Sequence, residues 1–181
     1  IYFSRLQALS PDGRCKTFDA SANGYTRGEG AGIVVLKRLS DAQAAGDRIL
    51  GIIKSTAINQ DGKSNGLTAP SAKAQQQVIQ AALKAAQLDP NDIDYIEAHG
   101  TGTPLGDPIE VDALKRIFGG RDRKAPALAL GSVKANIGHL EPAAGIAGLL
   151  KALLVIQRRK VPPHLHFKTL NPRINLDDGA I

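Results

Sequence analysis

The most regular hydrophobic pattern along the chain lies between Ser71 and Leu88. Apolar residues recur there at the spacing of one face of an α-helix, at positions 74, 78, 81, 82, 85 and 88. Ser71 belongs to the residue types that cap helix N-termini, and Asp89-Pro90 follows the last apolar position. The pattern therefore predicts an amphipathic helix over 71–88.

Short apolar, β-branched runs elsewhere in the chain predict strands. Residues 31–39 (AGIVVLKRL) and 48–60 (RILGIIKSTAINQ) are apolar enough for buried strands. Residues 92–98 (DIDYIEA) and 126–133 (PALALGSV) predict two more. Residues 1–30, by contrast, are rich in glycine and turn signals and predict irregular structure.

The strand at 92–98 is followed by His99 and then by a predicted helix. Pro108 fits the first helical position, and Asp107 before it is the predicted N-cap. Glu110 at the third helical position also serves the free amides of the first turn, and Gly119-Gly120 ends the helix. The order is therefore strand, histidine loop, helix.

The same order recurs directly afterwards. The strand at 126–133 leads into the loop 134–142, which carries His139, and then into a helix predicted over 143–159. Pro162-Pro163 stop that helix. Strands that alternate with helices are typical of a parallel sheet with helical crossovers, so the sequence predicts an α/β fold.

Two histidines and a lysine are therefore predicted at one edge of the sheet. Loops that follow neighbouring parallel strands leave the same edge, and such strands lie about 5 Å apart. His99 and His139 would converge there as donors to one oxyanion or as a general acid–base pair. Lys134 adds a cation to this edge, although a loop lysine of this kind is ordinarily exposed to solvent.

Composition narrows the class of protein. With 181 residues, 43% hydrophobic and 22% charged, the chain matches one globular domain or a large part of one. Its apolar runs are too short for a membrane span, and its first residues lack the layout of a signal peptide. A single cysteine excludes an internal disulfide, which favours a cytoplasmic location.

The net charge of +6 raises the question of nucleic-acid binding. The basic residues are spread out, without aromatic residues interleaved for base stacking and without a zinc-finger or helix-turn-helix signature. The charge therefore favours an acidic protein partner over nucleic acid.

Two further motifs are weaker candidates for a site. Gly28, Gly30 and Gly32 lack the spacing of a dinucleotide-binding loop and lead into a predicted strand, which disfavours a phosphate cradle. His164 and His166 have no further cysteine or histidine cluster at ligand spacing, so no metal site is predicted.

Cys15 is the only thiol in the chain. Its neighbours Arg14 and Lys16 would favour the thiolate, but no helix follows whose amides would face the sulfur. We therefore interpret Cys15 as structural.

Long stretches of the chain resemble the β-ketoacyl synthase family. EAHGTGTPLGDPIE (97–110) and GSVKANIGHLEPAAGIAGLLK (131–151) closely resemble its two histidine motifs. NQDGKSNGLTAP (59–70) and FDASANGYTRGEGAGIVVLKRL (18–39) resemble ketosynthase domains of type I modular polyketide synthases. The resemblance implies a thiolase-like fold of two similar α/β halves, with a nucleophilic cysteine in one and two histidines in the other.

The resemblance also implies a reaction and roles for individual residues. In this family the cysteine takes an acyl chain from an acyl carrier protein, and a carrier-bound malonyl-type unit loses carbon dioxide and attacks the acyl-cysteine. His99 and His139 would assist decarboxylation and hold the thioester carbonyl, and Lys134 would act as an anchor or electrostatically. Thr101 and Thr103 match positions that bind the phosphopantetheine arm. No metal or redox cofactor is implied.

One element of the family pattern is missing from the sequence. The family's nucleophile lies in an Ala-Cys-Ser segment, which is absent, and Cys15 matches a downstream DGRCK turn instead. We therefore interpret residues 1–181 as a partial ketosynthase domain: the end of the first half and most of the second, without its last strands. The parent would be a homodimeric acyltransferase, and these residues alone would be inactive.

A non-condensing alternative stays open at this point. The same residues would suit a module that binds carrier proteins, or only decarboxylates malonyl units, without forming a carbon–carbon bond. An upstream Ala-Cys-Ser segment would favour the condensing enzyme, whereas Gln or Ser in place of that cysteine would favour the alternative. The motifs carry no information on the starter unit, the extender unit or the product.

Overall fold

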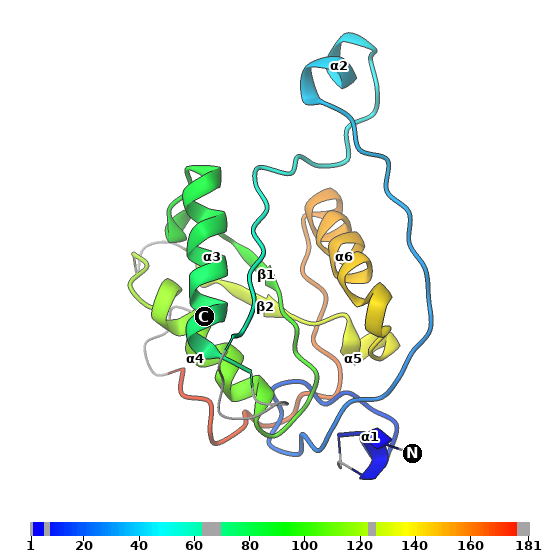
Figure 1. The fold of residues 1–181 in the computed structure, drawn as a ribbon, viewed down its shortest axis with the longest axis vertical. Helices are drawn as coiled ribbons and strands as arrows, with labels where there is room; N and C mark the ends of the chain where they lie inside the picture. The colour runs from blue at the N-terminus through cyan, green and yellow to red at the C-terminus, as the bar shows by residue number, and fades with distance from the viewer. Residues whose placement is uncertain (1, 6–7, 63–69, 123–125, 177–181) are drawn as a thin grey trace.

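A computed structural model describes residues 2–5, 8–62, 70–122 and 126–176 of the chain. Figure 1 shows a short sheet with α3 and α4 on one side and α6 on the other. The sheet consists of β1 (Tyr95–Glu97) and β2 (Ala129–Gly131). The helices are α1 (Tyr2–Arg5), α2 (Leu39–Ala44), α3 (Ala72–Ala86), α4 (Gly106–Phe118), α5 (Lys134–Ile137) and α6 (Ala144–Arg158), with the 3-10 turns η1 (Pro90–Asp92) and η2 (Glu141–Ala143).

The two strands are parallel neighbours, as the alternation of strands and helices predicts. Tyr95 pairs with Ala129, and Glu97 pairs with Gly131. α4 lies between them in the sequence and forms the crossover. The carboxyl ends of both strands therefore lie side by side, and the loops that follow them start from one edge.

The amphipathic helix predicted from Ser71 onward is α3. The Ser71 hydroxyl accepts a hydrogen bond from the Ala74 amide at 3.2 Å, which confirms the predicted cap. The helix ends at Ala86, and Gln87 follows in the left-handed conformation typical of a helix C-terminus.

The N-terminus of α4 differs from its prediction. Asp107 is not the N-cap, because it lies within the first turn with its side chain buried. Its carboxylate accepts hydrogen bonds from the backbone amides of Phe18 at 2.8 Å and Gly102 at 3.1 Å. The first turn is instead served by the Thr103 hydroxyl, which accepts from the Gly106 amide at 3.1 Å. Asp107 therefore ties α4 to two loops.

Side chains from α4 enter two clusters of buried residues, which fix this helix against the sheet. One cluster consists of Leu114, Phe118 and Leu128, and the other of Phe18, Ala98, Val111 and Ile174. Each large apolar side chain that is fully buried contributes about 1.5–3 kcal/mol. The position of α4 matters for the site because its first turns contact the loop after β1.

The strands predicted at 31–39 and 48–60 do not form. The structure assigns no strand to either stretch, and the side chains of Ile33, Val35 and Ile58 are 91%, 92% and 97% exposed. Figure 1 shows both stretches as extended segments leading to and from α2. A strand needs a neighbour for its backbone hydrogen bonds, and neither stretch pairs with one among the described residues. Their β-branched composition is thus not sufficient to form a sheet.

Candidate active site

The two histidine loops meet where β1 and β2 end. His99 follows β1 by two residues, and His139 follows α5, the short helix after β2. Their ring centroids lie 5.4 Å apart, and the rings meet edge to face at 82°. This separation is close to the spacing of neighbouring strands. The parallel pairing therefore brings the two imidazoles together, while their chemical role stays a prediction.

The backbone of His139 is bound to the loop before residue 30. Its amide donates to the Thr26 carbonyl at 2.7 Å, and its carbonyl accepts from the Gly28 amide at 3.0 Å. The ring Nδ1 accepts a hydrogen bond from the Glu141 amide at 3.0 Å. Because Nδ1 acts as an acceptor, the neutral imidazole carries its proton on Nε2. His139 is therefore a donor through Nε2.

Glu110 of α4 fixes the start of the His99 loop. Its carboxylate oxygens accept hydrogen bonds from the backbone amides of His99 at 2.6 Å and Gly100 at 2.8 Å. Burial raises the pKa of this carboxyl, whereas the two amides and Lys134 lower it. The prediction that Glu110 serves only the first turn of its own helix is wrong, because its carboxylate bonds across to the loop.

Gly100 is held on its carbonyl side as well. Its carbonyl oxygen accepts hydrogen bonds from the Thr17 hydroxyl at 2.8 Å and the Ser132 hydroxyl at 3.0 Å, and both of these side chains are fully buried. Gly100 has a φ of +42°, which favours glycine. Sequence reasoning missed Thr17 and Ser132, because nothing local distinguishes them from other hydroxyl residues.

The pKa values of both imidazoles are lowered, which favours their neutral forms at pH 7. Burial, together with Lys134 and His139, lowers the pKa of His99 to about 4, although the residue as a whole is exposed. Burial and Lys134 also lower the pKa of His139. A neutral imidazole donates one hydrogen bond and accepts another, which suits it to stabilise a developing oxyanion.

Lys134 is buried, with an exposed fraction of 4%. The structure therefore excludes the solvent-exposed loop lysine that its sequence context would ordinarily indicate. Burial lowers the pKa of Lys134, whereas Glu110 and Glu97 raise it. Because Lys134 also lowers the pKa of both histidines, it belongs to the same electrostatic environment.

Thr101 and Thr103 lie in the same loop and contact each other. Their hydroxyl oxygens are 3.1 Å apart, and the Thr103 hydroxyl also accepts from the Gly106 amide. Thr101 is buried, with an exposed fraction of 8%, whereas Thr103 is half-buried. Thr103 is therefore the more accessible of the two to a ligand, and one of its contacts is structural.

Of the weaker candidates, Gly28 and His164 lie in packed surroundings, whereas His166 is exposed. A Cβ atom at Gly28 would come within 2.3 Å of the Ile137 carbonyl oxygen, so this glycine stretch lies tightly against α5. The ring of His164 packs against Phe18 and Phe167, with centroids 5.8 Å and 6.4 Å away. Within the described ranges, no group of three potential ligand side chains could hold a metal ion, and no helix has the length and hydrophobicity to cross a bilayer.

Cys15 is buried, with an exposed fraction of 1%. Its sulfur accepts a hydrogen bond from the Thr26 amide at 3.2 Å. Burial raises the pKa of the thiol, so the neighbouring basic residues do not make it a thiolate. The neighbour Lys16 forms an ion pair with Asp12 at 2.9 Å. These contacts fit a structural cysteine.

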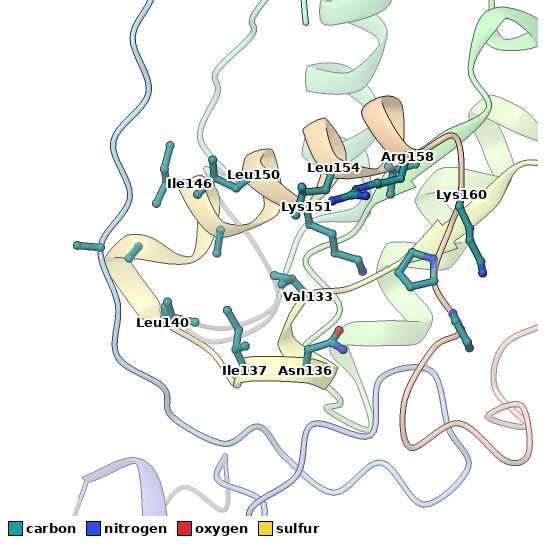
Figure 2. Close-up of a pocket in the computed structure, with 16 residues that line it drawn as sticks. Val133, Asn136, Ile137, Leu140, Ile146, Leu150, Lys151, Leu154, Arg158 and Lys160 are labelled. Carbon is teal, nitrogen blue, oxygen red and sulfur yellow. The ribbon is translucent and has the colours of Figure 1, made fainter. Parts of the chain in front are cut away.

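An open groove of about 680 Å³ lies beside α6 and does not include the histidines. Figure 2 shows its mainly apolar lining, with Leu150 and Leu154 on α6 and Ile137 and Leu140 in the His139 loop. Arg158, the last residue of α6, and Lys160, in the segment after it, also line the groove. The groove is therefore a surface of α6 that is separate from the histidine pair.

Comparison with known proteins finds a family and close relatives. The family model described as "Beta-ketoacyl synthase, C-terminal domain" matches residues 50–168, and the model of the corresponding N-terminal domain matches residues 1–42. One subunit of the phenolphthiocerol/phthiocerol polyketide synthase of Mycobacterium tuberculosis is 55% identical over 177 residues, which cover 97% of this chain and 9% of the relative. Another of its subunits is 57% identical over 172 residues, covering 95% and 8%.

Solved structures give the same result. The ketosynthase from module 6 of the bacillaene synthase of Bacillus subtilis 168 matches with a TM-score of 0.93 and 47% identity, over 99% of this chain and 32% of that chain. An oxazolomycin ketosynthase domain from Streptomyces albus JA3453 matches with a TM-score of 0.93 and 45% identity, over the same shares. The chain thus spans about a third of these solved structures and less than a tenth of these two curated relatives.

Proposed function

Because this chain belongs to the β-ketoacyl synthase family, we propose that it supplies the decarboxylating part of a polyketide synthase ketosynthase. Its fold is the α/β, thiolase-like fold of the ketosynthase structures, present in part, as predicted from the sequence. Residues 1–181 would form part of a single domain that catalyses a decarboxylative Claisen condensation. The relatives give no support to the non-condensing alternative.

One observation carries the proposal: the ring centroids of two imidazoles, whose pKa values are both lowered, lie 5.4 Å apart in the loops after adjoining strands. In the proposed reaction, the bond between C2 and the carboxyl carbon of a malonyl thioester breaks, and carbon dioxide leaves. The electron pair stays behind as an enolate, whose oxygen accepts hydrogen bonds from His99 and His139. The enolate carbon attacks an acyl thioester on a cysteine, and the cysteine thiolate leaves.

The remaining residues and partners follow from the same proposal. Lys134 stabilises developing negative charge through its buried cation, and Thr101 and Thr103 bind the phosphopantetheine arm. The arm belongs to an acyl carrier protein, whose acidic surface would suit the net charge of +6. The other partners would be the rest of the ketosynthase, neighbouring synthase domains and a second copy in a homodimer, in the cytoplasm. No metal or redox cofactor takes part.

Residues 1–181 by themselves are expected to resist acylation, because their only cysteine is buried with a raised thiol pKa. Intact-mass spectrometry after incubation with an acyl thioester probe should show no specific adduct. A stoichiometric adduct on Cys15 that disappears in Cys15→Ser and depends on His99 would overturn the structural assignment of this thiol. A complete ketosynthase domain, labelled in parallel, is the positive control.

The proposed arm contact is tested with Thr103→Val in a complete ketosynthase domain. Loss of the hydroxyl leaves an amide of the arm imperfectly paired, at a cost of about 1–2 kcal/mol. Decarboxylation of carrier-bound malonyl should therefore slow roughly 5- to 30-fold. A minimal malonyl thioester without the arm should react at nearly the wild-type rate.

The matched control for this experiment is Thr103→Ser, which retains the hydroxyl. It is needed because the Thr103 oxygen also accepts from the Gly106 amide at the start of α4. If the hydroxyl only supports that turn, Thr103→Val slows carrier-bound and minimal substrates equally, and the proposed arm contact is wrong.

A further inference from the structure

We propose that Glu97 of β1 and Lys151 of α6 are positioning residues that hold the His139 loop in register with His99. Neither residue is one of the groups assigned above to the reaction. The inference rests on the proposed function, since it concerns how the two donors are kept together. It rests on the ion pair between Glu97 and Lys151 and on the segments of the chain that this pair contacts.

Glu97 and Lys151 form a largely buried ion pair. The Lys151 Nζ atom lies 3.0 Å from Glu97 Oε2, and the side chains are 13% and 10% exposed, respectively. The Tyr95 hydroxyl donates a further hydrogen bond to Oε2 at 2.5 Å. Figure 2 shows Lys151 extending from α6 past Val133. The pair therefore joins the sheet to the helix that follows His139.

The second oxygen of the same carboxylate is bound to the other flank of the His139 loop. Glu97 Oε1 accepts a hydrogen bond from the Val133 amide at 2.5 Å. The Val133 carbonyl in turn accepts from the Asn136 and Ile137 amides, which closes the turn of α5 that starts at Lys134. Glu97 thus contacts the chain just before Lys134 and, through Lys151, the middle of α6, the helix that follows the His139 loop.

Glu97 also lies two residues before His99 on a strand that is fixed by its pairing with β2. A movement of the carboxylate relative to Val133 or Lys151 would therefore shift the segments on either side of the His139 loop relative to His99, while the contacts to Thr26 and Gly28 hold His139 itself. A displacement of about 1 Å at a catalytic group is enough to reduce a rate about 100-fold. A contact that prevents such a displacement has a measurable effect on the reaction.

Two glycines provide the space for this pair. A Cβ atom at Gly131 would lie 2.6 Å from the Tyr95 hydroxyl and 3.1 Å from Lys151 Nζ. A Cβ atom at Gly148 would lie 3.1 Å from Glu97 Cγ. A buried ion pair is weak evidence for stability, because desolvation of both charges offsets their attraction, and its best-attested use is to fix the register of elements. The space made for it favours such a role.

The test uses a complete ketosynthase domain with Glu97→Gln, Lys151→Met and the double variant. Asp112→Asn is the matched control, since Asp112 pairs with Arg116 at 2.9 Å in an exposed ion pair on α4. The kcat and KM for decarboxylation of malonyl carrier protein, the rate of acylation of the nucleophile, and hydrogen–deuterium exchange over residues 133–140 are measured for each variant.

Each single variant should lower the kcat for decarboxylation about 10- to 50-fold, with KM and the acylation rate changed by less than about threefold. Amides in 133–140 should exchange about 10-fold faster. The double variant should lose no more kcat than the more impaired single variant, because both substitutions break the same ion pair. Asp112→Asn should match the wild type in every measurement.

The double variant leaves no unpaired buried charge. It therefore tests the positioning role even if a single variant does not fold. Wild-type kcat and exchange in the double variant would overturn the proposed positioning role of Glu97 and Lys151. An equal loss of acylation and decarboxylation in the variants would also overturn it. A wild-type domain that does not decarboxylate malonyl carrier protein would overturn the proposed function instead. In that case, faster exchange over 133–140 in the variants would still support the positioning role of Glu97 and Lys151, and unchanged exchange would overturn it.

Discussion

Replacing His139 with alanine in a complete ketosynthase domain is expected to slow decarboxylation of carrier-bound malonyl by about 100- to 1000-fold. The substitution removes the Nε2 donor that the Glu141 contact to Nδ1 leaves protonated. The loss concerns negative charge that develops in the transition state, so acylation of the nucleophile should suffer less. Both half-reactions can be followed separately, by release of carbon dioxide and by mass spectrometry of the acyl-enzyme.

The His139 loop should survive this substitution, because its backbone contacts to Thr26 and Gly28 do not involve the ring. Equal losses in decarboxylation and acylation would contradict this expectation and indicate that the loop had collapsed. His166→Ala is the matched control, since His166 is exposed in the segment after α6. It should leave both half-reactions within about twofold of the wild type.

Gly100→Ala is expected to combine a large loss of stability with a large loss of rate. The Cβ atom would lie 2.6 Å from Thr17 Cγ2 and 2.8 Å from Ser132 Cβ, in a backbone with φ of +42°. Overpacking of a filled interior costs about 1–3 kcal/mol, and the left-handed backbone adds about 1–2 kcal/mol for a residue with a side chain. The free energy of unfolding of the complete domain should therefore fall by about 2–5 kcal/mol.

The rate of decarboxylation should fall as well. Relief of the clash would displace residue 100, which directly follows His99. A shift of about 1 Å there would reduce decarboxylation about 100-fold. Gly46→Ala separates the two costs: Gly46 also has a positive φ, +69°, but no atom lies within 4 Å of the place that a Cβ atom would occupy. If Gly100→Ala costs no more stability than Gly46→Ala and leaves the rate unchanged, the close packing around Gly100 is unimportant.

Local patterns in the sequence were sufficient for the elements around the site. The apolar spacing and Ser71 predicted α3, and the repeated order of strand, histidine loop and helix predicted the parallel pair β1 and β2. These predictions succeeded because each depends on residues close together in the chain, where periodicity and caps act. The proximity of His99 and His139 followed from the pairing of two strands.

Predictions that depend on distant residues failed or could not be made. Glu110 and Asp107 bind loops instead of capping α4, and the partner of Asp107, Phe18, is far away in the sequence. The apolar stretches at 31–39 and 48–60 read as buried strands, yet pairing depends on a neighbour that the pattern within a stretch does not reveal. Local propensity therefore identified candidate strands without determining whether they pair.

Because β1 and β2 pair in one register, the points at which the two histidine loops leave the sheet change their relative position only in steps. A slip of two residues along one strand would move one loop start by about 6.6 Å relative to the other, and no register of the same facing lies between. If the proposed donor role is correct, selection or design that alters substrate choice would work around loop starts of fixed spacing. Under the proposed function, diversity among related enzymes would arise in the walls that surround the histidine pair, while the pair would keep a constant spacing for one carbonyl oxygen.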